Sequence, residues 1–108
     1  MNRSEILSTA DQAVSVDRDA AYGGPERNFA AIAGLWSEYL GEEIGCADVA
    51  AMMILLKLAR MKSNPSYEDN WVDIAGYAAC GGEITTKARR SKPPFFEATP
   101  YKEVDPNP

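Results

Sequence analysis

The sequence contains no histidine and only two cysteines, Cys46 and Cys80, among its 108 residues. The absence of histidine removes the usual general base and excludes every Ser-His or Cys-His nucleophile arrangement. A catalytic zinc site is not expected, because its ligands come mainly from histidine and cysteine. Any chemistry would therefore rest on carboxylates, Lys, Tyr or a carboxylate-bound metal, and both cysteines are expected to be free thiols.

Long apolar runs and an excess of basic residues are also missing. No run reaches the roughly 20 apolar residues of a membrane span, and no signal peptide is recognisable. The formal net charge is −5, and residues 1–82 carry six basic against twelve acidic side chains. Proteins that bind a long nucleic-acid backbone carry a cluster of basic residues on their surface, so we do not expect a long nucleic acid as partner. The absence of a long apolar run likewise argues against a membrane as partner. A small anionic ligand held by a few local cations stays compatible with this charge.

What the sequence does have is an apolar helix over residues 48–62, DVAAMMILLKLARMK. Apolar side chains occupy most of its circumference, a pattern typical of a buried helix. We expect it to be the central and most buried element, with other helices on both sides. A chain this short buries a core only marginally by itself, so the second apolar side also predicts a homo-oligomer. Lys57 and Arg60 interrupt the pattern and need partners, because burying an unpaired charge costs several kcal/mol.

Three further helices are predicted, so the fold class is all-α: a compact bundle of about four helices. The first begins at Ser4 and ends near residue 16; the second covers 29–40 and stops at Gly41. The last begins after Ser66 and is broken by Gly81-Gly82. Residues 1–83 then form the helical domain. Residues 84–108 are rich in proline and partly basic, and they form an irregular tail that is extended or disordered.

Two polar clusters differ from ordinary helix surface. One surrounds the glycine loop before the second helix, and the other lies on one side of the last helix, close to the cations of the central helix. Internal neutralisation, with Asp69 or Asp73 paired to Lys57 or Arg60, is one interpretation. The other is a cleft in which Lys57 and Arg60 hold a phosphate and an aromatic ring such as Tyr22 or Tyr77 stacks on a base.

The blocks RDAAYGGPERNFAAIAGLWSEYL, DVAAMMILLKLARMKSNP and EDNWVDIAGYAACGGEI, in this order and spacing, resemble a family of short tailed-phage and prophage proteins of unknown function. More loosely, the chain is similar to phage nucleotide-modification-associated domains, with the same Tyr-Gly, Lys-x-x-Arg and Asp-x-x-x-Tyr placements. The resemblance implies a phage-encoded helical protein that acts around nucleotides in the cytoplasm of the infected bacterial host. The ligand-binding positions it implies are Arg18, Asp19, Tyr22, Gly23, Asn28, Lys57, Arg60, Asn70, Asp73 and Tyr77, and it also covers Pro25 and Asp69.

Three functions follow as hypotheses. The first is binding and sequestration of a small anionic nucleotide, such as a host immune signalling nucleotide, by analogy with small phage proteins of that class. It needs no cofactor and no catalytic residue. The second is a protein-binding inhibitor of a host factor. The third is a Mg²⁺-dependent nucleotide pyrophosphohydrolase-like enzyme, in which Asp69 and Asp73 are metal ligands; the paired Glu-rich motif of such enzymes is not visible here.

Overall fold

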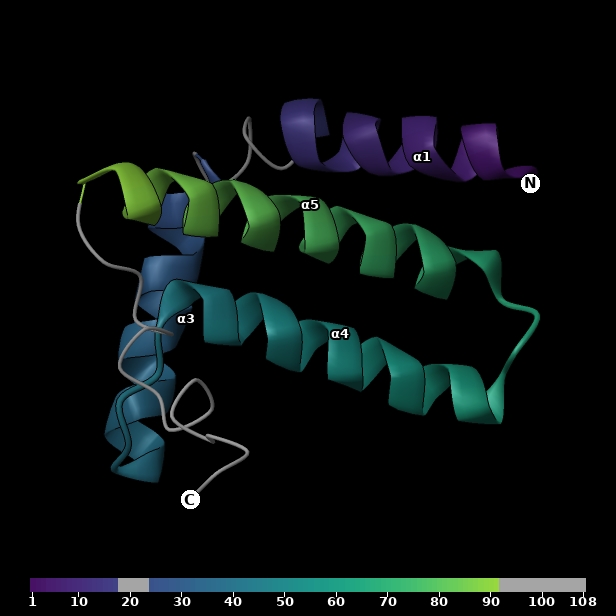
Figure 1. Ribbon diagram of the computed structural model, residues 1–108. Coiled ribbons are helices and arrows are strands. Elements are labelled where there is room, and N and C mark those ends of the chain that lie inside the picture. The colour runs from purple at the N-terminus through teal and green to yellow at the C-terminus, as the bar shows by residue number, and fades with distance from the viewer. Residues whose placement is uncertain (18–23, 92–108) are drawn as a thin grey trace, which may run out of the picture.

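The computed structural model describes residues 1–17 and 24–91, and these residues are helical throughout apart from short connections (Figure 1). The elements are α1 (Arg3–Gln12), a π-helical turn η1 (Ala13–Asp17), α3 (Pro25–Leu40), α4 (Cys46–Ser63) and α5 (Glu68–Ser91). The described part of the chain contains four α-helices and no strand, which confirms the predicted all-α fold.

The long helices α4 and α5 form an antiparallel hairpin, and the other two helices pack on it (Figure 1). Helix α1 lies along α5 on the side away from α4, and the amino group of Met1 forms an ion pair with Glu68. Helix α3 crosses the hairpin at the opposite end from the α4–α5 connection. There Lys87 of α5 contacts Glu26 in the first turn of α3 at 2.7 Å, which ties the two helices together.

The core lies where α3 crosses α4 and α5. Phe29 and Val49 are fully buried at its centre, and the ring of Phe29 lies 6.3 Å from that of Tyr77 between centroids. Small side chains fill the rest of this region, so the helices approach closely. The buried cluster consists of Phe29, Ala33, Val49, Ala50, Cys80 and Ile84.

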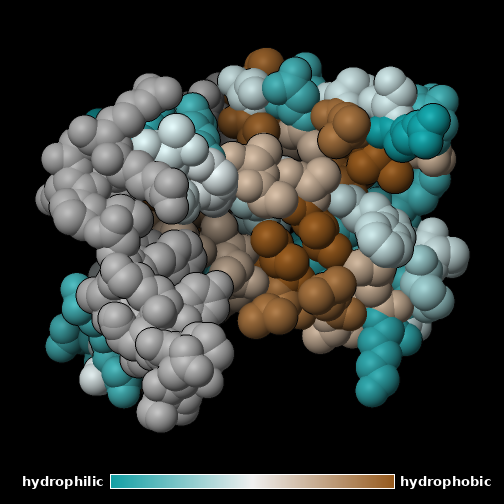
Figure 2. Space-filling view, viewed as in Figure 1, coloured by the Kyte–Doolittle hydropathy of each residue, from teal (hydrophilic) through white to brown (hydrophobic). Residues whose placement is uncertain are grey.

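Helix α4 buries one side and exposes the other, so the prediction of a helix buried around its circumference holds only in part. Ala47, Val49 and Ala50 are buried, whereas Leu55 and Leu58 are exposed. Figure 2 shows an apolar patch over α4 on the viewed face. The predicted homo-oligomer, in which a second copy covers this side, stays a prediction.

The helix boundaries follow local signals, with two corrections. Gly41 ends α3 in the left-handed region at φ 68°, and the N–H of Gly45 donates to the Asp48 carboxylate at 2.9 Å at the start of α4, as predicted. Helix α1, however, is capped by Asn2 rather than Ser4, through reciprocal bonds with Glu5. Helix α5 begins at Glu68, two residues after the predicted cap at Ser66.

The prediction that Gly81 and Gly82 end the last helix is wrong, because α5 continues to Ser91. It thereby includes residues 84–91, which the sequence pattern assigned to the tail; residues 92–108 lie outside the described part. Gly81 has a packing role instead: a Cβ built there would lie 2.9 Å from the Cβ of Ala50 on α4. The side chain of Ala50 on α4 therefore packs directly against the backbone of α5 at Gly81, and the absence of a side chain on glycine permits this close approach.

Candidate functional site

A groove of about 500 Å³ lies between α4 and α5 at the end where the two helices are connected. Five residues singled out in the sequence line it: Lys57, Arg60, Asp69, Asn70 and Asp73. Sequence reasoning missed three neighbours in the lining. These are Ser63, the last residue of α4, and Asn64 and Tyr67 of the connection, because residues at a helix end or in a loop give no periodic signal. Leu56 and Ala59 complete the lining. The hairpin thus brings the second predicted cluster and both cations of α4 to one place.

Lys57 and Asp73 form an ion pair across the groove at 2.8 Å. This is the internal neutralisation that the sequence left as one of two interpretations, and it accounts for one of the two cations. The pair is asymmetric, since the Lys57 side chain is 13 % exposed and that of Asp73 is 39 % exposed. Most of the desolvation therefore falls on the ammonium group.

We expect the two halves of this pair to differ in their effect on stability. Asp73→Ala leaves a largely buried ammonium without its partner and should lower the free energy of unfolding by about 1.5–3 kcal/mol, the range for hydrogen bonds to charged groups. Lys57→Met keeps the apolar stem and leaves a carboxylate that water reaches, so its loss should be smaller. Urea denaturation of both variants measures the difference, and a larger loss for Lys57→Met would contradict the asymmetry.

The other carboxylate of the groove, Asp69, interacts with Tyr67. A hydrogen bond to Asp69 raises the pKa of the Tyr67 hydroxyl, and the negative charge of Asp69 acts in the same direction. The pKa is raised further by desolvation and by the charge of Asp73, while Lys57 opposes the shift. The ring of Tyr67 is half exposed beside the groove, so it offers an accessible aromatic face.

Arg60 differs from Lys57 in its surroundings. It is exposed, and no carboxylate of the described residues lies within ion-pair distance of its guanidinium group. Asp73 of the groove pairs with Lys57, and Asp69 interacts with Tyr67. The positive charge of Arg60 is therefore available at the groove, as the ligand interpretation of the sequence requires.

The remaining predicted residues do not join this groove. Arg18, Asp19, Tyr22 and Gly23 lie outside the described residues. Asn28 is half-buried in the first turn of α3, at the far end of the hairpin, and it does not line the groove. Tyr77 is half-buried against Phe29 and borders other, shallower depressions.

The metal interpretation of Asp69 and Asp73 gains no third ligand from the described residues. No group of three or more Asp, Glu or Cys side chains that could hold a metal ion occurs in residues 1–17 and 24–91. Asp73 is in addition engaged by Lys57. The metal interpretation of this pair stays a prediction.

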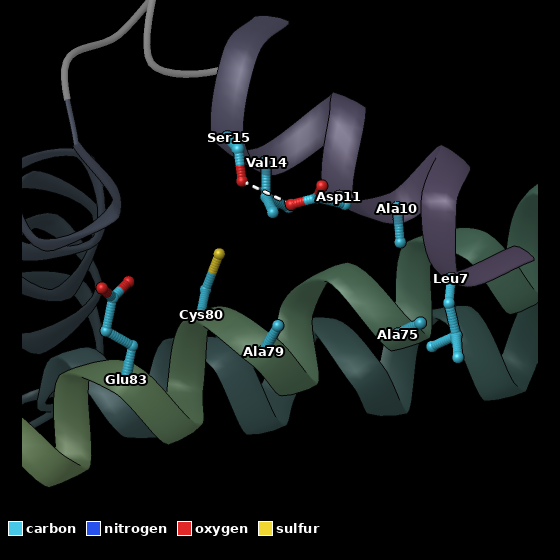
Figure 3. A pocket seen from close by; sticks show the side chains of 9 residues that line it. All are labelled: Leu7, Ala10, Asp11, Val14, Ser15, Ala75, Ala79, Cys80 and Glu83. Carbon is cyan, nitrogen blue, oxygen red and sulfur yellow. Dashed lines mark hydrogen bonds between the residues drawn. The ribbon is translucent and has the colours of Figure 1, made fainter.

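A second groove of about 470 Å³ separates α1 and η1 from α5 and contains none of the predicted site residues (Figure 3). Small apolar side chains such as Ala10 and Ala79 form part of its surface, and Asp11 and Glu83 border it. The carboxylate of Asp11 accepts a hydrogen bond from the Ser15 hydroxyl at 2.8 Å. No cation lines this groove, so it does not suit an anion.

In the described residues, the fold and the groove define a small all-helical domain with an exposed arginine, Arg60, in the groove between two antiparallel helices. Residues 5–85 match the family model described as Domain of unknown function (DUF6378), and the chain belongs to this family. The match covers α1, η1, α3, α4 and most of α5.

Two relatives are mycobacteriophage proteins. The chain is 41 % identical over 88 residues to the Gene 55 protein of Mycobacterium phage D29, which covers 82 % of this chain and 58 % of that protein. It is 47 % identical over 74 residues to the Gene 55 protein of Mycobacterium phage L5, covering 68 % of this chain and 47 % of that protein. The chain thus spans about half the length of these relatives. They confirm the resemblance to phage proteins of unknown function.

No solved structure matches the chain. Among the described residues, every helix is too short or too polar to cross a membrane. The looser similarity to nucleotide-modification-associated domains stays a prediction.

Proposed function

We propose that the α4–α5 groove binds a small anionic nucleotide. The observation that carries this proposal is the exposed guanidinium group of Arg60, which borders a groove of about 500 Å³ and has no carboxylate partner among the described residues. A guanidinium group presents a planar fork of donors that matches two phosphate oxygens. The half-exposed ring of Tyr67 lies in the same lining and supplies a face on which a base stacks.

This proposal differs from the sequence hypothesis in the role of Lys57. The sequence placed Lys57 and Arg60 together on the phosphate, but the charge of Lys57 is neutralised by Asp73. The ion pair between Lys57 and Asp73 then holds α4 and α5 together at the groove, and the guanidinium group of Arg60 binds the phosphate. One phosphate contact suits a mononucleotide or a cyclic nucleotide better than a long polyanion.

In the cell, we propose sequestration of such a nucleotide in the cytoplasm of an infected bacterium, by a homo-oligomer of this chain. The phage origin of the two relatives supports this setting. The exposed leucines of α4 support self-association, since a second copy would remove Leu55 and Leu58 from water. A binding protein requires no metal and no general base, which agrees with a sequence that lacks histidine.

Replacing Arg60 by alanine tests the proposal. Because Arg60 has no ion-pair partner among the described residues, stability should change by no more than about 0.5 kcal/mol. Nucleotide binding should weaken by about 1.5–3 kcal/mol, which is tenfold or more in Kd. The measurement is a thermal melt with and without a panel of cyclic nucleotides and ADP-ribose, followed by calorimetry with the ligand that raises the melting temperature.

Lys62→Ala is the matched control. Lys62 is an exposed cation on the same helix that does not line the groove, so its removal should leave both stability and binding unchanged. If no nucleotide of the panel shifts the wild-type melting temperature, the proposal fails. A strongly destabilised Arg60→Ala variant would instead make Arg60 a structural residue.

A further inference from the structure

Asn70 is the one buried polar residue in the described part of the chain, with 3 % of its surface exposed. Its backbone N–H donates to the Tyr67 carbonyl oxygen at 3.2 Å. Its side-chain amide has no hydrogen-bond partner among the described residues. Buried polar groups are nearly always paired, because an unpaired buried donor or acceptor is costly. The described residues therefore supply no partner for the side-chain amide of Asn70, which a bound ligand would provide.

The position of Asn70 indicates that a hydrogen-bond partner for its amide would lie in the α4–α5 groove. Asn70 lines the α4–α5 groove together with Arg60. Arg60 follows Lys57 by three residues and Asn70 precedes Asp73 by three, so both lie one helical turn closer to the connection than the Lys57–Asp73 pair. In an antiparallel hairpin, Arg60 and Asn70 are thus at the same level on opposite walls.

We infer that Asn70 reads the base of the bound nucleotide and that the ligand is an adenine nucleotide. A carboxamide presents one acceptor oxygen beside an NH₂ donor. Adenine offers the complementary pair, the N6 amino donor and the N7 acceptor, and asparagine binds this edge through two hydrogen bonds. Guanine and hypoxanthine present two acceptors there, O6 and N7, which leaves the Asn70 oxygen without a donor. This inference rests on the proposed function, since it assumes that Arg60 holds the phosphate of the same ligand.

The experiment compares AMP with IMP, two nucleotides of the same size that differ in the group at position 6 of the base and in the proton that IMP carries on the adjacent N1. Calorimetric titration of the wild-type full chain should give a Kd for AMP that is about ten- to a hundredfold lower than for IMP, the discrimination of a bidentate pair. Asn70→Leu, which is similar in size and removes the unpaired amide, should bring the two Kd values together. Arg60→Ala should weaken AMP and IMP by the same factor and keep their ratio.

Melting temperatures of the variants separate binding from folding. Asn70→Leu should melt at the wild-type temperature or higher, because replacing an unpaired buried amide by an apolar group removes a desolvation cost. If AMP and IMP bind the wild type with equal Kd, the assignment of Asn70 is overturned while nucleotide binding stands. If CMP, whose N4 amino group also lies beside a ring acceptor, binds as tightly as AMP, the adenine assignment is overturned. If none of the three binds although a cyclic nucleotide or ADP-ribose raises the melting temperature, the assignment of Asn70 is overturned; if no nucleotide of that panel raises it either, the proposed function itself fails.

Discussion

Phe29→Ala should lower the free energy of unfolding by about 3–5 kcal/mol, the range for removing a buried aromatic side chain. Phe29 is fully buried, at 0 % exposure, in the cluster where α3 crosses α4 and α5, and its ring packs against Tyr77. Phe29 is the largest fully buried side chain of the described residues, and the buried residues around it are mostly small. Removing the ring leaves a cavity that alanine, valine and cysteine neighbours cannot fill.

Chemical denaturation followed by circular dichroism measures this loss. Tyr39→Ala is the control, because Tyr39 lies on the same helix with 89 % of its surface exposed. Its removal should change stability by no more than about 0.5 kcal/mol. Equal losses for the two variants would mean that α3 does not pack on the hairpin through Phe29.

Gly82→Ala should stabilise the protein and Gly81→Ala should not, although the two glycines are adjacent in α5. A Cβ at position 81 would lie 2.9 Å from the Cβ of Ala50, whereas a Cβ at position 82 would meet no atom within 4 Å. Both substitutions gain about 1 kcal/mol of helix propensity. Only Gly81→Ala also forces the two helices apart, at a cost of about 1–3 kcal/mol for overpacking.

The difference between the two variants isolates the crowding, because the propensity gain cancels. We expect Gly82→Ala to melt above the wild type and Gly81→Ala to be less stable than Gly82→Ala by about 1–3 kcal/mol in urea denaturation. Two variants of equal stability would show that α4 and α5 do not approach closely at this level.

The sequence by itself determined the helices and several of their ends. The spacing of Phe29, Trp36 and Leu40 places α3, and Gly41 ends it, because these signals act within one or two turns. Gly45 and Asp48 likewise define the start of α4. The pairing of adjacent helices into a hairpin follows from their short connection. The polar cluster of Asp69 and Asp73 beside the cations of α4 could be predicted for the same reason.

Only the tertiary structure decided how each residue is used. Gly81 has the same local preferences as Gly82, and its fit against Ala50 depends on a helix more than thirty positions earlier in the chain. Lys57 and Arg60 are equivalent in the sequence pattern, but the helix register places only Lys57 opposite Asp73. The apolar pattern of α4 does not reveal which side α3 and α5 cover. The burial of Asn70 depends on both walls of the groove, since a polar residue on a helix carries no sequence signal for burial.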